Sequence, residues 1–143
     1  MQQQNFYICK KLLKKNLPKV AAHMDNLNLD ITMYATQWLM TIFTNSFPFS
    51  FVTLVWDVFL HEGWKIVFRC YIAIMKHSAP KLLRMDFEQA MMFFRELPGK
   101  VDGVIMMQRA LAIPLKGREI QRLRLKYQVI KQREEEKMAA RDS

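Results

Sequence analysis

The stretch from Trp64 to about Lys76 constrains the fold more than any other part of the sequence, because it is apolar on nearly every side. Before Lys76, only Lys65 and Arg69 interrupt it with charge. A helix of this kind is stable in a globular protein only where other helices cover all of its faces. We therefore expect this segment to form the central helix, and we expect Ser78-Ala79-Pro80 to end it.

The rest of the sequence also predicts helices. Apolar residues recur at three- and four-residue intervals from Phe6 to Leu17. With only 4 glycines and 5 prolines, the chain lacks the many turns of a β-sandwich. We predict an all-α fold, a multi-helix array of about six to eight helices. Residues 1–114 form the helical domain in this prediction, and residues 115–143 form a charged amphipathic helical tail.

Helix boundaries follow from capping residues. Pro18 and Pro48 stand at predicted helix starts, where a missing N–H group costs little. Gly63 is a predicted C-terminal cap. Asp86 followed by Gln89 is typical of a capping box, and the helix that it opens is expected to end before Pro98-Gly99. The other predicted helices span residues 19–27, 32–44, 48–61 and 101–112.

The segment from Ile31 to Trp56 has 26 residues without a charge, which is long enough to cross a bilayer. However, Asn45-Ser46-Phe47-Pro48 interrupts it and leaves two pieces of about a dozen residues, the length of buried helices. The sequence therefore favours two core helices. Membrane association through this segment is kept as a third alternative.

The sequence offers no self-contained catalytic constellation. Cys9 and Cys70 lie 61 positions apart without a CxxC motif, which disfavours a metal cage or a disulfide framework and is typical of a cytoplasmic protein. The four glycines are too far apart for a phosphate-binding loop, and the three histidines form no HExxH pair. We expect no cofactor and no metal.

The chain is basic, with 22 Lys and Arg against 13 Asp and Glu, and this charge favours acidic partners or membranes. The aromatic residues between Phe43 and Phe94 lie on core-type faces and are not interleaved with the basic residues, so we expect no nucleic acid. Arg69 lies midway along the most apolar helix. We expect it to pair with Asp57 or Glu62, or to reach the rim of the core.

The sequence also contains several short strings whose order along the chain is more specific than the helical spacing of apolar residues. The strings are His23-Met-Asp-Asn-Leu, Met33-Tyr34-Ala35-Thr36-Gln37-Trp38-Leu39-Met40-Thr41-Ile42-Phe43, Phe47-Pro48-Phe49, Trp56-Asp57-Val58-Phe59-Leu60-His61-Glu62-Gly63, Ile66-Val67-Phe68-Arg69, Asp86-Phe87-Glu88-Gln89-Ala90 and Phe93-Phe94-Arg95. Together, over residues 6–113, they resemble the second half of the all-helical TBC domain of Rab GTPase-activating proteins. The resemblance implies structural roles for eight signature residues: Tyr34, Trp38, Phe43, Pro48, Trp56, Asp57, Gly63 and Arg69. Because Asp57 lies near a helix C-terminus, it needs a specific partner, such as Arg69 or a lysine.

The sequence departs from the family pattern at the two motifs that supply the catalytic residues. Proteins of this family act through an arginine from an IxxDxxR motif and a glutamine from a YxQ motif, and an arginine supplied in trans accelerates GTP hydrolysis by roughly 10³–10⁵. This sequence has no IxxDxxR, and its Tyr34-Ala-Thr-Gln37 is one residue longer than YxQ. The resemblance therefore implies a GTPase regulator that lacks both catalytic fingers and is inactive alone.

The implied partner is a Rab-type small GTPase, whose identity the sequence does not specify, as it does not specify the oligomeric state. The alternative is a non-catalytic module that binds a Rab or another helix. Both interpretations allow peripheral association with endomembranes. A partial domain also predicts an exposed apolar patch, drawn from Phe6, Leu13, Met33, Tyr34, Met40 and the Met91–Phe94 region.

Overall fold

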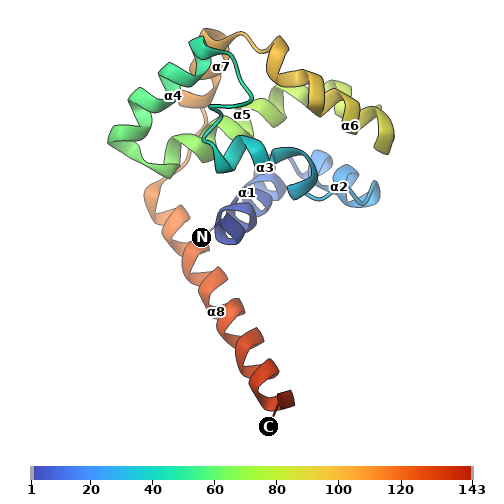
Figure 1. The fold of residues 1–143 in the computed structure, drawn as a ribbon, viewed down its shortest axis with the longest axis vertical. Helices are drawn as coiled ribbons and strands as arrows, with labels where there is room; N and C mark the ends of the chain where they lie inside the picture. Colours follow the sequence, from blue (N-terminus) through green and yellow to red (C-terminus); the bar gives the residue numbers. More distant parts are fainter. Residues whose placement is uncertain (1, 143) are drawn as a thin grey trace.

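The computed structural model describes residues 2–142, which fold into eight α-helices and one short 3-10 helix (Figure 1). In chain order, the elements are α1 (Gln2–Asn16), α2 (Pro18–Asn26), α3 (Thr32–Met40), α4 (Phe49–Glu62), α5 (Trp64–Leu82), α6 (Phe87–Glu96), η1 (Leu97–Lys100), α7 (Gly103–Leu111) and α8 (Gly117–Asp142). The described residues contain no strand, so the all-α prediction is confirmed.

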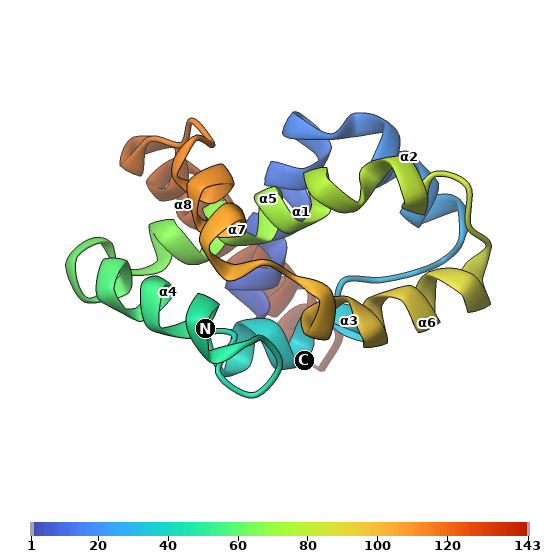
Figure 2. The ribbon, with the colours of Figure 1, turned by 90° about the horizontal axis from the view of Figure 1, so that it is seen from above.

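Helix α5 is the centre of the fold, as its apolar sequence predicts. It contacts α1, α4 and α7, and it passes through the middle of the molecule with α4 near one of its ends and α6 near the other (Figure 2). Phe68, Tyr71 and Ile74 on this helix have no exposed surface. Full burial of such side chains stabilises a protein by roughly 1.5–3 kcal/mol each. The side chains of α5 that its neighbours bury are therefore a major source of the stability of the fold.

The prediction that Ser78-Ala79-Pro80 ends this helix is wrong, because α5 continues to Leu82. Leu82 is fully buried, and its burial favours the extra turn. Pro80 is exposed near the helix end, where the loss of one N–H donor is tolerable. The Ser78 hydroxyl donates to the carbonyl of Ile74 at 2.7 Å, inside the helix.

The uncharged segment divides into α3 and α4, although α3 ends at Met40 and not near Thr44 as predicted. Ile42 and Phe43 have φ angles of 48° and 67°, a left-handed conformation that no helix contains. The Phe43 side chain is fully buried, and this burial holds the strained turn in place. Within the described residues, none of the helices combines the length and the apolar content needed to cross a bilayer.

Two helix starts carry aspartate caps. Asp86 accepts a hydrogen bond from the Gln89 N–H at 2.9 Å, and the Gln89 side chain accepts one from the Asp86 N–H at 3.0 Å, which confirms the capping box. Asp102 accepts from the Ile105 N–H at 3.1 Å and opens α7 at Gly103, two residues later than predicted.

Helices α4 and α7 approach each other closely at Gly103. A Cβ atom at this position would lie 2.7 Å from the backbone nitrogen of Phe51 and 2.9 Å from its Cα, closer than atoms pack. The backbone of α7 therefore rests directly on the start of α4, and only glycine fits between them.

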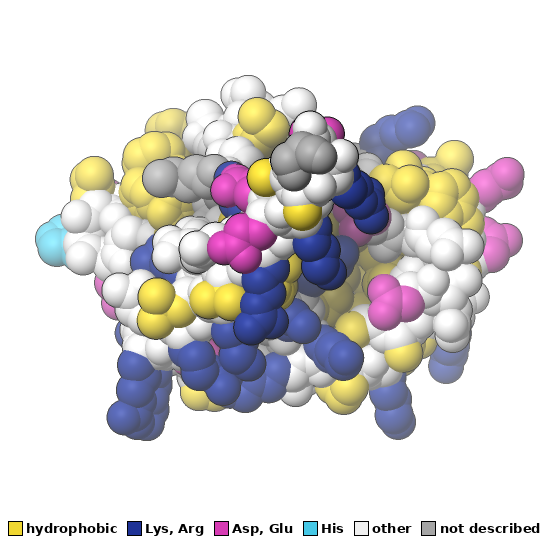
Figure 3. Space-filling view, turned by 90° about the horizontal axis from the view of Figure 1, so that it is seen from below, with side chains coloured by type: hydrophobic (Ala, Val, Ile, Leu, Met, Phe, Trp, Pro, Cys, Tyr) yellow, Lys and Arg dark blue, Asp and Glu magenta, His cyan; other side chains and the backbone are white. Residues whose placement is uncertain are grey.

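The charged tail is helical, as predicted. Its first half packs antiparallel on α1: the rings of Tyr7 and Tyr127 lie 5.4 Å apart, and the Tyr127 hydroxyl donates to Gln3 at 3.3 Å. Lys15 forms an ion pair with Glu119 at the other end of this contact. The second half projects away from the body (Figure 1), and Lys and Arg side chains gather on the face from which it projects (Figure 3).

The contact between α5 and α7 predicts a pH-dependent stability. The Arg109 guanidinium donates to Nδ1 of His77, which requires a neutral imidazole. Burial, and then the charges of Arg109 and Lys81, lower the pKa of His77. The unfolded chain therefore binds more protons, so the free energy of unfolding falls as the pH drops below the ordinary histidine pKa of about 6.5.

Denaturant unfolding between pH 8 and pH 5 measures this effect. His77→Gln should reduce the loss of stability over this range, whereas the control His61→Gln should leave it unchanged. An identical pH profile for His77→Gln and the unsubstituted protein would contradict the assignment.

Candidate functional site

A wall of aromatic rings joins α3 to α6. The Tyr34 ring stacks on Phe94, with ring centroids 4.1 Å apart and planes inclined by 14°. Trp38 meets Phe94 edge-on at 5.9 Å and Phe47 at 5.4 Å. Aromatic pairs of this geometry contribute about 0.5–1.5 kcal/mol each beyond their buried area. We call Tyr34, Trp38, Phe47 and Phe94 the aromatic wall.

Two further signature residues direct the chain from α3 into α4. The Phe43 ring lies edge-on to Phe47 at 5.2 Å and to Phe51 at 5.5 Å. The Pro48 carbonyl accepts hydrogen bonds from the N–H groups of Phe51 and Val52 and so begins α4. Both residues make these contacts inside the fold and within the connection from α3 to α4.

Tyr34 has a second partner behind the wall. Its hydroxyl lies 2.7 Å from the hydroxyl of Tyr71 on α5. Burial raises the pKa of both tyrosines well above the usual value. The pair is therefore neutral and joins α3 to the central helix.

A groove of about 450 Å³ lies against the wall, between α3, the turn after it, α6 and η1. Its lining includes Met33 and Met91, the turn residues Asn45 and Ser46, and Arg95. Arg95 is exposed and makes no ion pair with any residue from 2 to 142. We call this feature the α3–α6 groove.

The residues of the predicted apolar patch differ in their exposure to solvent. Met33 and Met40 are 50% and 56% exposed, and neighbouring Met92 is 59% exposed. Leu13 and Phe94 are buried and are not among the residues that such a patch can use. Each instead belongs to the core, where Phe94 completes the aromatic wall.

The other signature residues form the corner between α4 and α5. Gly63 makes the turn with φ 66° and ψ −144°, which confirms the predicted cap. The Trp56 indole N–H donates to the Thr44 hydroxyl at 3.2 Å, and its ring lies 5.1 Å from that of Phe59. These contacts attach α4 to the turn after α3.

Arg69 pairs with Glu62, not with Asp57. Its Nη1 lies 3.3 Å from the Glu62 carboxylate, and 14% of the arginine side chain is exposed. Asp57 is exposed and forms no ion pair within the described residues, so the prediction of a charged partner for it is wrong. The Asp57 carboxylate lies at the surface, where water can solvate it. The Arg69–Glu62 ion pair joins α5 to the end of α4 without Asp57.

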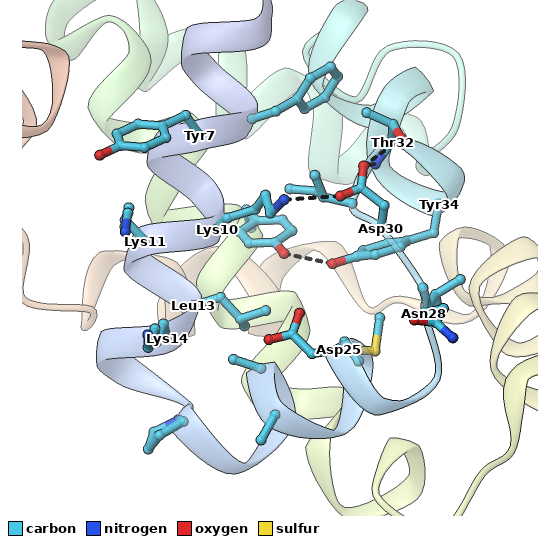
Figure 4. A pocket seen from close by; sticks show the side chains of 18 of the residues that line it. Tyr7, Lys10, Lys11, Leu13, Lys14, Asp25, Asn28, Asp30, Thr32 and Tyr34 are labelled. Carbon is cyan, nitrogen blue, oxygen red and sulfur yellow. Dashed lines mark hydrogen bonds and ion pairs between the residues drawn. The ribbon is translucent and has the colours of Figure 1, made fainter. Parts of the chain in front are cut away.

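A larger groove of about 820 Å³ lies between α1, α2 and the connection to α3 (Figure 4). Lys10, Lys11 and Lys14 on α1 form one side, which we call the basic rim. Asp25 and Asp30 form the opposite acidic rim. We call this feature the α1 groove, and its floor is apolar, with Phe6, Leu13, Met24, Leu29, Tyr34 and Tyr71.

Asp30 connects the two rims. Its carboxylate accepts hydrogen bonds from the Thr32 hydroxyl at 2.6 Å, the Thr32 N–H at 3.1 Å and Lys10 Nζ at 3.0 Å. The Thr32 hydroxyl bond, together with Lys10, lowers the pKa of this carboxyl. Asp30 therefore stays ionised and fixes the start of α3 against α1.

Neither groove contains a catalytic constellation. Burial raises the pKa of the Cys9 and Cys70 thiols, which makes them poor nucleophiles. No cluster of His, Cys, Asp and Glu side chains suited to a metal ion occurs within residues 2–142. Both grooves are therefore candidates for binding, with aromatic or apolar floors and charged rims.

These features coincide with a known domain. The protein-family model of the Rab-GTPase-TBC domain matches residues 2–83, which include all eight signature residues. The chain belongs to this family. The match extends from α1 to the end of α5, so the corner, the turn after α3 and the central helix lie within the family's shared part.

The chain also aligns with individual relatives, two of which are named as Rab GTPase-activating proteins. The chain is 30% identical over 128 residues to the human Ecotropic viral integration site 5 protein homolog, covering 87% of this chain and 16% of the relative. It is 34% identical over 96 residues to Rab GTPase-activating protein tbc-11 of Caenorhabditis elegans, covering 66% and 10%. It is 35% identical over 85 residues to TBC1 domain family member 14 of Rattus norvegicus, covering 59% and 12%. The chain thus spans a small part of each relative.

Sequence reasoning did not find the grooves. Arg95 belongs to the Phe93-Phe94-Arg95 string, but most residues that line a groove with it, or with the lysines of α1, come from other parts of the chain. The spacing of Lys10 and Lys14 indicates one helix face. Nothing in the local sequence indicates that Asp25 and Asp30 lie opposite.

The corner at Gly63 predicts a cost for a side chain there. Its backbone conformation is almost closed to other residues, so Gly63→Ala should destabilise the protein by about 1–3 kcal/mol in denaturant unfolding. Gly99→Ala is the matched control, because no atom lies within 4 Å of an added Cβ at either position and only Gly63 has a positive φ. Equal effects of the two substitutions would contradict the argument.

The Asp30 contacts predict a second effect. Asp30→Asn should lower the free energy of unfolding by about 1 kcal/mol at pH 7. The pKa of Asp30 is lowered by folding, so its contribution is lost as the pH falls through that folded-state pKa, and the difference from the unsubstituted protein should then disappear. Asp25→Asn, on the same rim without a side-chain partner among the described residues, is the control. A deficit that persists at low pH would contradict this role.

Proposed function

We propose that the chain is a GTPase regulator of the Rab-activating class, in which it supplies the helical scaffold and part of the surface that faces the GTPase. The α3–α6 groove carries this proposal. The exposed Met33 and the half-buried Met91 in its lining suit a protein partner because methionine side chains adapt in shape. Arg95, which has no ion pair among the described residues, suits an acidic group. The names of the relatives support a Rab-type GTPase as that partner.

We further propose that the chain does not supply the chemistry. Stimulation of GTP hydrolysis needs an arginine that reaches the nucleotide of the partner. Arg95 in the α3–α6 groove has no ion pair among the described residues, but it does not stand in an IxxDxxR motif. The absence of IxxDxxR and of a YxQ motif from the sequence supports the same conclusion.

The alternative is a non-catalytic module that binds a Rab or another helical partner through the same groove. The apolar and basic character of the groove favours either ligand. Action in the cytoplasm, at the surface of endomembranes, is proposed for both cases. The two functions differ in whether the bound partner is a GTP-loaded Rab.

A binding and hydrolysis experiment tests the proposal. The purified chain, presented to a panel of GTP-loaded Rab proteins, should bind at least one without accelerating hydrolysis. Arg95→Glu should weaken this binding roughly tenfold or more, as expected at an interface anchor. Arg84→Glu is the matched control, because Arg84 is equally exposed and lies outside the groove.

Three results would contradict the proposal. Accelerated hydrolysis by the chain would show that it supplies a catalytic group. Binding that Arg95→Glu leaves intact would exclude the α3–α6 groove, and failure to bind any Rab would favour the alternative module.

A further inference from the structure

The side of α8 that faces away from the body has a distinct composition. Ile120 and Leu123 are buried and Tyr127 contacts α1, so these three residues mark the inner side of the helix. At 100° per residue, the opposite half of the helix between residues 118 and 133 is fully exposed. We call its residues the outward face: Arg118, Gln121, Arg122, Leu125, Lys126, Gln128, Val129, Gln132 and Arg133.

The outward face carries only positive charge. Its Lys and Arg side chains form no ion pair with any residue from 2 to 142. The nearby Glu119 lies on the inner side and pairs with Lys15, and the acidic run Glu134–Glu136 begins only after the face ends. Unpaired cations along about 23 Å of helix attract a surface that carries many negative charges.

Helix α1 adds positive charge beside this part of the tail. Lys11 Nζ lies 5.5 Å from the centroid of the Tyr7 ring, and that ring lies 5.4 Å from the ring of Tyr127. Lys11 is exposed and has no ion pair among the described residues. Lys and Arg side chains gather around the tail in Figure 3. The positive potential therefore extends from the tail onto the body.

Two aliphatic side chains lie among the cations of the outward face. Leu125 is 63% exposed and Val129 is 47% exposed, one helical turn apart. At a membrane surface, such side chains leave water and enter the boundary between lipid headgroups and acyl chains. Basic and aliphatic residues on the exposed side of one helix are typical of helices that lie on anionic bilayers. The face has no aromatic ring to stack on a base, which disfavours a nucleic acid.

We propose that the outward face docks α8 on an anionic membrane surface, with the helix axis parallel to the bilayer. The basic side chains bind lipid phosphate and carboxylate groups, while Leu125 and Val129 enter the interface. This inference rests on the proposed action at endomembranes and assigns it to a surface separate from the α3–α6 groove.

The position of the tail permits this contact. Because the inner side of α8 faces the body, a flat surface laid on the outward face has the body on the far side of the helix. The helix also continues away from the body beyond this face (Figure 1). A bilayer can therefore meet residues 118–133 along their whole length.

Co-sedimentation of the 143-residue chain with vesicles tests the proposal without any Rab. The chain should bind vesicles of phosphatidylcholine with phosphatidylserine but not vesicles of phosphatidylcholine alone, and the binding should weaken as salt increases. Arg122→Glu with Lys126→Glu should weaken it roughly tenfold or more. Lys131→Glu with Arg141→Glu is the matched control, because it changes the net charge equally on the inner side of the same helix and should have a much smaller effect.

The aliphatic part is tested separately. Leu125→Ser with Val129→Ser should weaken binding to the same vesicles severalfold, because the variant loses apolar contact with the interface. Ile130→Ser with Met138→Ser is the control, since both residues are exposed on the inner side, and it should bind as the unsubstituted chain does. Equal effects of the two pairs would contradict the entry of Leu125 and Val129 into the interface. Circular dichroism and thermal unfolding establish that each variant is folded.

Membrane docking and the proposed binding of a Rab can fail separately. Arg95→Glu should leave vesicle binding unchanged, and Arg122→Glu with Lys126→Glu should leave the binding of a Rab in solution unchanged. A chain that binds anionic vesicles but no Rab supports membrane docking alone. A chain that binds a Rab but no anionic vesicle overturns it.

Two further results would overturn membrane docking. The first is an equal loss of vesicle binding in both charge-reversal pairs, which would show that net charge acts without a defined face. The second is tighter binding to a DNA duplex than to anionic vesicles, which would indicate a nucleic-acid surface.

Discussion

The requirement to cover α5 on every side organises the rest of the structure. A helix with fully buried residues around its whole circumference needs neighbours in several directions, and α1, α4 and α7 occupy them. These three helices are distant in the sequence, so the chain has to reverse direction sharply between them. The corner at Gly63 and the strained turn at Ile42 and Phe43 are consequences of this requirement.

Much of this fold is predictable because the signals are local. The apolar circumference of α5, the Asp86–Gln89 capping box and the Gly63 cap each depend on a few neighbouring residues, and all three are confirmed. The predicted helix ends are wrong where contacts with residues distant in the sequence determine the end of the helix. Burial of Leu82 extends α5 past Pro80, and burial of Phe43 stabilises a turn in place of a fourth helical turn in α3. The close approach at Gly103 depends on a helix 40 residues earlier in the chain and has no sequence signature.

The signature residues and the candidate binding surfaces are formed by different kinds of residue. Gly63 and Arg69 fix the corner between α4 and α5, and Trp56 attaches α4 to the turn after α3, so these contacts all lie inside the fold. The surfaces that can meet a partner are formed by residues with no fixed partner, such as Arg95 and Lys14. A family motif therefore identifies the scaffold, while the specificity of a member depends on residues between the motifs. This explains why resemblance predicts the fold of the chain better than its partner.

The exposed methionines on α3 and α6 have a chemical consequence. Met33, Met40 and Met92 are at least half exposed, whereas Met75 in α5 has no accessible surface. Peroxide therefore reaches the first group well before the second, and conversion to the sulfoxide turns a soft apolar side chain into a polar one. Oxidation would thus alter the exposed surface of α3 and α6 while the core stays intact, so the proposed binding of a partner would be lost before the fold is.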